Sequence, residues 1–461
     1  METKQDRQRC LEKLTWAIEQ LQGKADRNQL SKIAELIIQT MTGPWRFFHT
    51  PEHIFEVGNG GDAIEVLAAL FHDLVYVQID QSVGINIVRY IVPFIQDVGG
   101  QLVVLERSDM PEDRLFEMTL DIFGFTPGQI LLPTGGQNEF LSALICVKSL
   151  ANALSISQIA QITACIEATI PFRPKLDSGL RPSDRLYQRL ISTNQKFRLG
   201  WTDADIQIIV KRAVRLANRD VENFASPSAA HFLDNTWNLL PETNHDLANV
   251  NSYSVRGYRI SLQKMESFMN FLQPEVVFQQ FGDEPNQQDY QDLLVKTKQN
   301  IEIARLYLGT KLTSIAVLEA LSFRIGHDIP LSTMMGELPT ADANFPGLEQ
   351  FLLNVPVPCQ PEAELEKIVL SLLENGRSSS SSYDLKNSPV ATFMVKSIGF
   401  TAIRAILLKA KELFGGNITA DEFIFYCHPK VLLAINEGVL KLFENRKQAL
   451  RIEPDQFQSS Y

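Results

Sequence analysis

Apolar residues recur at helical spacing over most of this chain, and this periodicity is the strongest limit on its fold. Candidate helices begin where a capping residue precedes a periodic run. The clearest ones span residues 138–154, 157–170, 202–224, 261–272, 287–306 and 419–445. Two of them begin with a capping box, Thr202 with Asp205 and Thr419 with Glu422, in which an acid follows a threonine by three positions. The periodicity therefore predicts a mostly α-helical protein.

Two stretches depart from the helical pattern. Gly99-Gly100 opens the β-like run QLVVLER, and the later run GQILLPTGG is again short, apolar and bounded by glycines. The serine run 378–382 has the composition of a flexible linker. We therefore expect a helical domain at 1–250 with a β-containing insertion at 97–137, a helical extension at 251–375, a Ser-rich linker at 376–388 and a helical module at 389–461.

Composition excludes some classes of function. The chain has 461 residues of which 45 % are apolar, enough for large buried cores in two or three domains. Its net charge of −11 includes no basic block, so the protein as a whole would repel a polyanion. Nucleic acid is not expected as its main partner.

Location and redox state are also expectations from sequence. The polar N-terminus lacks the pattern of a signal peptide, and no run reaches the length of about eighteen apolar residues that a membrane helix needs. We therefore expect a cytoplasmic protein without a membrane span. The cysteines are scattered, which fits buried thiols better than disulfides or a zinc site: Cys10, Cys146, Cys165, Cys359 and Cys427.

Histidines cluster in one part of the chain. Of the seven in the sequence, His49, His53 and His72 lie close together, in FFHTPEHIFEV and AALFHDLVYV. Asp62 follows two glycines and can cap a helix running through AIEVLAALFHDLVY. That helix has almost no polar face, so it must be buried.

The pair His72-Asp73 ends this buried helix, and both side chains need partners there. A divalent cation would satisfy both. Nitrogen and oxygen ligands together suit Mn, Fe, Co, Ni or Zn, whereas Mg prefers sites built mainly from oxygen. The alternative is that both side chains bond to neighbouring backbone and merely close the helix end.

The surroundings of this pair resemble the HD superfamily, in particular its predicted metal-dependent phosphohydrolases. In these proteins a Tyr-His-x-x-x-His segment precedes a helix that ends in Ala-Ala-x-Phe-His-Asp-x-x-Tyr. The matching residues here are Phe48, His49, His53, Ala68, Ala69, Phe71, His72, Asp73 and Tyr76. The resemblance covers residues 45–224 and implies a helical HD-domain core with additional C-terminal helices.

The resemblance also implies a set of metal ligands. The family uses a first histidine, the His-Asp pair and a final aspartate in a Leu-Ala-Asp-Arg segment. His53, His72 and Asp73 match the first three, but Asn218 stands at the fourth position. An amide oxygen can bind a cation, but it brings no negative charge.

Two acids near Asn218 could replace the missing aspartate. Asp220 is about 200° further around the helix, and we expect it to point away from the face of Val214 and Val221 unless the register differs. Glu222 lies one turn after Asn218 on the same face and could reach the site.

The family further implies roles for neighbouring residues. Asp73 would orient or deprotonate a water molecule, and His49 would contact the substrate or the leaving group. Arg173, Lys175 and Arg181 are cations of the kind that recognise phosphate, although a solvated basic loop is an alternative interpretation.

We therefore expect a metal-dependent hydrolase of a phosphoester, with a small phosphorylated molecule such as a nucleotide as its partner. The alternative is a catalytically inert HD-fold protein that binds a nucleotide or a partner protein. Asn218 favours this alternative, and the retained histidines oppose it. Apolar stripes after residue 251 are assigned to packing or homo-oligomerisation, and the second pair, His327-Asp328, to an unrelated loop.

Overall fold

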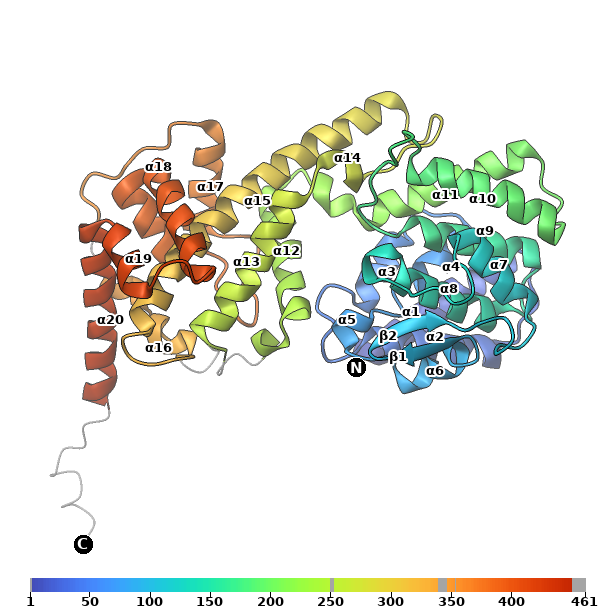
Figure 1. The fold of residues 1–461 in the computed structure, drawn as a ribbon, viewed down its shortest axis with the longest axis horizontal. Coiled ribbons are helices and arrows are strands. Elements are labelled where there is room, and N and C mark those ends of the chain that lie inside the picture. The colour runs from blue at the N-terminus through green and yellow to red at the C-terminus, as the bar shows by residue number, and fades with distance from the viewer. Residues whose placement is uncertain (1, 249–252, 339–345, 353, 450–461) are drawn as a thin grey trace, which may run out of the picture. The chain divides into compact units, whose positions relative to one another are not determined.

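The protein is described by a computed structural model that covers residues 2–248, 253–338, 346–352 and 354–449. Helices make up most of the described chain, and its only sheet has two strands (Figure 1). The expected mostly α fold with a small β element is confirmed.

The chain forms two compact units, and each is built from two separate segments. The first unit comprises Met1–Pro227 and Leu272–Lys298. Its elements are α1 (Glu2–Gln20), α2 (Arg27–Met41), α3 (Pro51–Val57), α4 (Ala63–Phe71), α5 (Val77–Asp80), α6 (Ile85–Ile91), β1 (Ile95–Val98), β2 (Gln101–Val104), α7 (Arg114–Phe123), α8 (Gln137–Leu150), α9 (Ile156–Ala168), α10 (Pro182–Phe197), α11 (Asp203–Asp220), α14 (Pro274–Val277) and the start of α15.

The second unit comprises Ser228–Phe271 and Gln299–Tyr461. Its elements are α12 (Ala229–Thr243), α13 (Val255–Phe271), the rest of α15 (Gln287–Ser322), α16 (Leu331–Met335), α17 (Glu364–Asn375), α18 (Pro389–Phe414), α19 (Ala420–Tyr426) and α20 (Pro429–Ala449).

Helix α4 lies at the centre of the first unit. All of its residues are buried, as its unbroken apolar sequence requires, and it packs against α1, α8 and α9. Asp62 caps the helix by accepting hydrogen bonds from the backbone N–H groups of Ile64 and Glu65. The Glu65 carboxylate accepts one from the Asp62 N–H in return, so both ends of a capping box are present.

The expected insertion begins with a β-hairpin. Strands β1 and β2 pair antiparallel with Ile95 opposite Val104, and Gly99 and Gly100 form the turn. Both glycines have positive φ values, 62° and 84°, which few other residues adopt. The remainder of residues 97–137 holds α7, a 3₁₀ turn at Pro133–Gly135 and an isolated antiparallel β-bridge between Val103 and Ile130, but no further strand.

The helix predictions differ from the structure mainly at their ends. The two capping boxes at Thr202 and Thr419 are confirmed. The predicted helix at 419–445 is two helices, because Pro429 lacks an N–H group and starts α20 after a break. The predicted helix at 287–306 continues to Ser322.

Segment 376–388, expected as a flexible linker, is packed into the second unit. Arg377, Tyr383 and Ser388 are 2 %, 2 % and 5 % exposed. The serines gave the segment its linker composition, whereas these three buried residues anchor it. The division into two units also falls elsewhere than the expected boundaries at 250 and 375.

Two further sequence features can be compared with the structure. The cysteines are free thiols, and all are buried except the partly exposed Cys359. Helix α18 is long and apolar enough to span a membrane, but this is weak evidence because the core helix of a folded protein meets the same criterion.

Candidate metal centre

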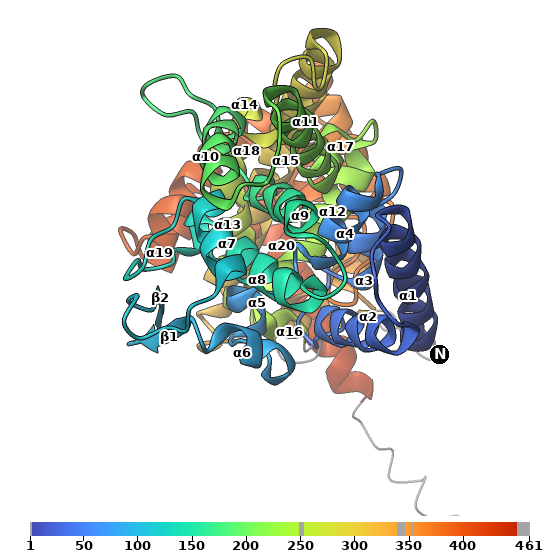
Figure 2. The same cartoon turned by 90° about the vertical axis from the view of Figure 1, so that its right-hand side faces the viewer.

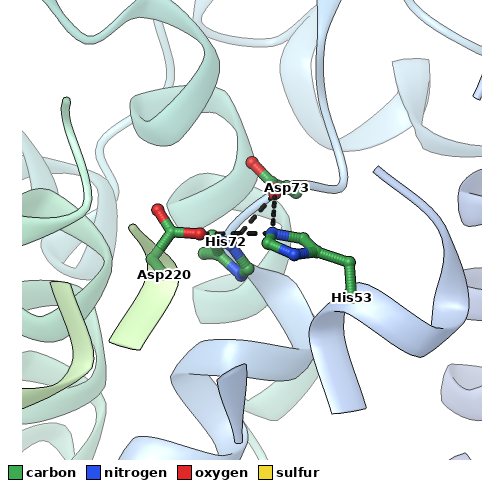
Figure 3. A group of neighbouring side chains, drawn as sticks. All are labelled: His53, His72, Asp73 and Asp220. Atoms are coloured by element: carbon green, nitrogen blue, oxygen red, sulfur yellow. Dashed lines mark hydrogen bonds and ion pairs between the residues drawn. The ribbon is translucent and has the colours of Figure 1, made fainter. Parts of the chain in front are cut away.

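Four side chains from three helix ends meet in the first unit (Figure 3). His53 lies in the first turn of α3, after Thr50 and the initiating Pro51. His72 is the C-terminal cap of α4 and Asp73 follows it. Asp220 is the last residue of α11. Each offers one ligand atom, and the four atoms all lie within 4.8 Å of one another.

The distances between nitrogens and oxygens are short and similar. His53 Nε2 lies 3.2 Å from both Asp73 Oδ2 and Asp220 Oδ1. His72 Nε2 lies 3.0 Å and 3.2 Å from the same two oxygens. Two imidazole nitrogens and two carboxylate oxygens therefore surround one point.

The orientation of the histidines favours metal binding. His72 Nδ1 lies 2.8 Å from the carbonyl oxygen of Ala69, which can only accept, so Nδ1 carries a proton and Nε2 is the atom that points into the cluster, where it could bind a metal once its own proton is displaced. His53 Nε2 is buried without a hydrogen-bond partner of good geometry. A buried polar atom in this state requires an explanation, and a cation at the centre would supply one.

The pKa values follow from this crowding. Burial alone would lower the pKa of His53, but the adjacent carboxylates of Asp220 and Asp73 outweigh it and raise the pKa to about 9. Burial alone would raise the pKa of Asp73, but the charges of His72 and then His49 hold it well below its usual value. Without a cation the cluster therefore retains protons, which a bound metal would displace.

Arg46 holds the turn that carries Asp73. Its guanidinium donates to the carbonyl oxygens of Asp73 and Leu74, and it forms an ion pair of 2.6 Å with Asp80. The side chain is fully buried. Nothing in the sequence pattern indicated this role, because the contacts join segments that are far apart in the chain.

The register of α11 is fixed by arginines on one of its faces. Arg212 pairs with Asp62 at 2.6 Å, and Arg215 and Arg219 each pair with Glu65 at 3.3 Å. Both acids belong to the capping box of α4. These pairs attach the end of α11 to the start of α4 and so bring the last turn of α11 to the cluster.

Asn218 does not join the cluster in this structure. Its side-chain amide donates to the backbone carbonyl of Gln279 at 2.9 Å, and its oxygen accepts from the Gln279 N–H at 2.8 Å. The fourth ligand position expected at Asn218 is therefore corrected to Asp220.

Contrary to expectation, Asp220 points into the cluster, because the buried face of α11 is not centred on Val214 and Val221. The buried face of α11 includes Ala213, Leu216 and Ala217. Asp220 lies seven, four and three residues after them, so it continues that face by one turn. Glu222 falls in a short 3₁₀ turn beyond α11 and is not a member of the cluster.

The donor set fits the expected metals. Two imidazoles and two carboxylates suit a borderline transition cation such as Mn, Fe, Co, Ni or Zn, and the added carboxylate supplies the negative charge that Asn218 could not. The side chains of His53, Asp73 and Asp220 are 9 %, 16 % and 16 % exposed, so a small ligand can reach the centre from solvent.

Two further titratable residues border the cluster. His49 is 9 % exposed, and its ring centroid lies 5.7 Å from that of His53 and 4.7 Å from that of Tyr76. Glu139, at the start of α8, has a buried carboxylate oxygen without a hydrogen-bond partner. Burial raises the pKa of Glu139 to about 8, and the charge of Asp73 adds to this rise.

The three predicted phosphate-binding cations lie apart from the four ligands. Arg173, Lys175 and Arg181 line one cavity of the first unit, and none of the ligands lines that cavity. Only Arg173 is linked to the centre, because its charge lowers the pKa of Glu139 against the effects of burial and Asp73.

We compared the chain with known protein families, curated proteins and solved structures. No protein-family model, curated protein or solved structure matches the chain.

Proposed function

We propose that this protein is a metal-dependent phosphohydrolase of the HD superfamily that acts on a small phosphorylated molecule. The observation that supports this proposal is the convergence of His53, His72, Asp73 and Asp220 from three helix ends onto one point. The chain order of these ligands, a histidine, a His-Asp pair and a late aspartate, is the order that the family resemblance implies.

A divalent cation held by these residues would supply a hydroxide nucleophile at neutral pH and neutralise charge on the phosphoryl oxygens. Asp73 contributes one carboxylate oxygen to the cluster and would orient the attacking water or accept its proton. His49 lies beside Asp73, where its imidazole can donate a hydrogen bond to the substrate or to the leaving group.

The alternative of an inert HD-fold binding protein loses its main support. It depended on Asn218 in place of a ligand carboxylate, but Asp220 supplies a carboxylate at this point. Four candidate ligands remain without Asn218, which supports the enzyme over the binding protein.

The first test is the metal content of protein purified without chelator. We expect about one transition cation per chain in the wild type and none in the His72→Ala, Asp73→Ala variant. The chain offers a matched control in its second His-Asp pair, because His327 and Asp328 are exposed. The His327→Ala, Asp328→Ala variant should retain the metal and the hydrolysis of p-nitrophenyl phosphate or nucleotides.

The outcomes separate the two classes of function. Metal and hydrolysis that disappear together in the His72→Ala, Asp73→Ala variant would support the enzyme. Bound metal without hydrolysis of any phosphoester tested would support the binding protein instead. A wild-type protein that takes up no cation even from excess would contradict the proposed centre.

A further inference from the structure

A cavity of about 330 Å³ lies in the first unit next to the metal centre. Its walls are the end of α9 with the following loop, the start of α10, the last turns of α11 and the segment around α14, which Figure 2 shows near one another. This volume is at the lower end of the range for small-molecule sites. None of the described residues that line it is a ligand of the metal centre.

The charges on the wall favour an anion. Arg173, Lys175 and Arg181 line the cavity against a single acid, Glu275. Arg173 is paired with the buried Glu167. Arg181 donates to the carbonyl and side-chain oxygens of Gln280 rather than to a carboxylate.

Lys175 makes no ion pair with any of the described residues. It is an exposed residue of the loop after α9, where it lines the cavity. Together with Arg181 it leaves two positive charges without a carboxylate partner on one concave surface. Arg and Lys side chains bind phosphate through strong charge-assisted hydrogen bonds.

Aromatic side chains form another part of the wall. Phe172, Phe278 and Tyr290 line the cavity together with the three cations. Phe172 has a φ of 55°, a left-handed conformation that costs about 1 kcal/mol or more in a residue of this kind. Strain of this sort occurs most often at ligand sites, and here it orients the residue that precedes Arg173. An aromatic wall beside unpaired cations fits a ring that carries a phosphate.

The cavity is linked mechanically to the metal centre. Ala217 and Val221 line it, and the metal ligand Asp220 lies between them on the last turn of α11. Asn218, on the same turn, holds the backbone of Gln279 with two hydrogen bonds. The Gln279 side chain in turn donates to the carbonyl of Ala168 at 2.7 Å. A ligand that orders this wall also orders the turn that presents Asp220.

We propose that this cavity is a second binding site, which takes a small monophosphorylated molecule with one aromatic ring system and raises the affinity of the metal centre for its cation. Binding in the cavity does not depend on the proposed function; the coupling does, because it requires that the centre holds a metal. The expected coupling is roughly fivefold or more in metal affinity, and the metal raises the affinity for the ligand by the same factor.

Adenosine monophosphate is a suitable probe for binding. Calorimetric titration into metal-free Asp220→Ala protein should show one site, with tighter binding of adenosine monophosphate than of inorganic phosphate or adenosine. Lys175→Glu and Arg181→Gln should each weaken it at least tenfold. The Lys175 side chain is exposed and forms no ion pair with the described residues, so Lys175→Glu should change the charge of the cavity wall and leave the fold intact. Arg198→Ala, at the exposed far end of α10, should have no effect.

Several results would overturn this site. Adenosine monophosphate that fails to bind Asp220→Ala protein, or that binds Lys175→Glu and Arg181→Gln proteins as tightly as the wild type, would exclude the cavity. Inorganic phosphate that binds as tightly as adenosine monophosphate would exclude a role for the aromatic wall.

The coupling is tested by titrating Mn²⁺ into wild-type protein with and without adenosine monophosphate, after the association of the two in solution has been measured separately. The gain in Mn²⁺ affinity should vanish in Lys175→Glu and fall in Asn218→Ala. A gain that persists in Lys175→Glu would place the nucleotide at the metal centre instead. A wild type that binds adenosine monophosphate but no metal would contradict the proposed function and leave the cavity site intact.

Discussion

Each unit of the protein buries a cluster of charged side chains, and the two clusters balance their charges in different ways. In the second unit, Lys311 lies 2.8 Å from Asp384, and Arg377 lies 3.4 Å from Asp234 and 3.6 Å from Asp384. The Arg377 guanidinium also stacks 4.3 Å from the ring centroid of Trp237. Two cations therefore match two carboxylates within the fold itself.

In the first unit the partners of the two carboxylates are histidines. An imidazole loses its proton near neutral pH, whereas a guanidinium keeps its charge. The positive charge in the first cluster can therefore be exchanged for a metal ion, and that in the second cluster cannot. A buried cluster of carboxylates therefore indicates a metal site when the positive charge beside it is a proton on histidine, which a metal ion can displace.

The largest effect should follow from breaking the second cluster. Asp384→Asn would leave Lys311 and Arg377 with only Asp234, and removal of one partner from a buried ion pair costs about 3–5 kcal/mol in the free energy of unfolding. Asp73→Asn in metal-free protein should cost much less, because His53 and His72 can release their protons. Urea denaturation at pH 7 measures both.

Metal content provides the control for this comparison. Folded Asp384→Asn protein should hold its cation as the wild type does, whereas Asp73→Asn should not. Equal losses of stability in the two variants would mean that both clusters are permanent ion pairs, and the distinction between them would fail.

The second prediction concerns the two candidate residues on the last turn of α11. Asp220→Ala removes a carboxylate from the cluster and should weaken metal binding by more than about 100-fold. Asn218→Ala removes only a contact with Gln279. The metal affinity of this variant should stay at least tenfold higher than that of Asp220→Ala. Competition with a chromophoric chelator gives both affinities. If Asn218→Ala proved the more damaging variant, the ligand would be Asn218 as the family pattern implied.

The part of the metal centre that sequence could predict is local. His53, His72 and Asp73 were found because they lie close together in the chain and because α4 is apolar on every side. The position of Asp220 does not follow from the sequence, because Val214 and Val221 alone do not define the buried stripe that Ala213 and Ala217 continue.

Other parts of the site depend on contacts between distant segments. Arg46 reaches the carbonyl of Asp73, and the segment around Gln279 returns to the first unit after two helices of the second. No periodic pattern records such contacts. The serine-rich segment shows the converse error, since its composition indicated a linker but buried Arg377 anchors it.

The third prediction uses the protons of the first cluster. Because the carboxylates raise the pKa of His53 to about 9 against the effect of burial, a metal must displace a proton from it at neutral pH. Metal affinity should therefore rise between pH 6 and 8, by about tenfold per pH unit for each proton displaced. Titrations in buffers of different ionisation enthalpy count the released protons. An affinity independent of pH would show that the ligands are already deprotonated.

The last prediction concerns Glu139, beside the first cluster. Burial raises its pKa to about 8 from 4.5, so the folded protein binds a proton there that the unfolded chain has already lost. This group therefore makes metal-free protein less stable as the pH rises from about 4.5 to 8. Glu139→Gln removes the titration, so above pH 8 the variant should be more stable than the wild type.

The carboxylates of Asp73 and Asp220 oppose the ionisation of Glu139, whereas the charge of Arg173 favours it. Denaturation of metal-free protein across the pH range, with the exposed Glu112→Gln as matched control, isolates the effect. Identical pH profiles for wild type and Glu139→Gln would show that Glu139 ionises normally, and that the negative charge of the metal-free cluster does not extend to α8.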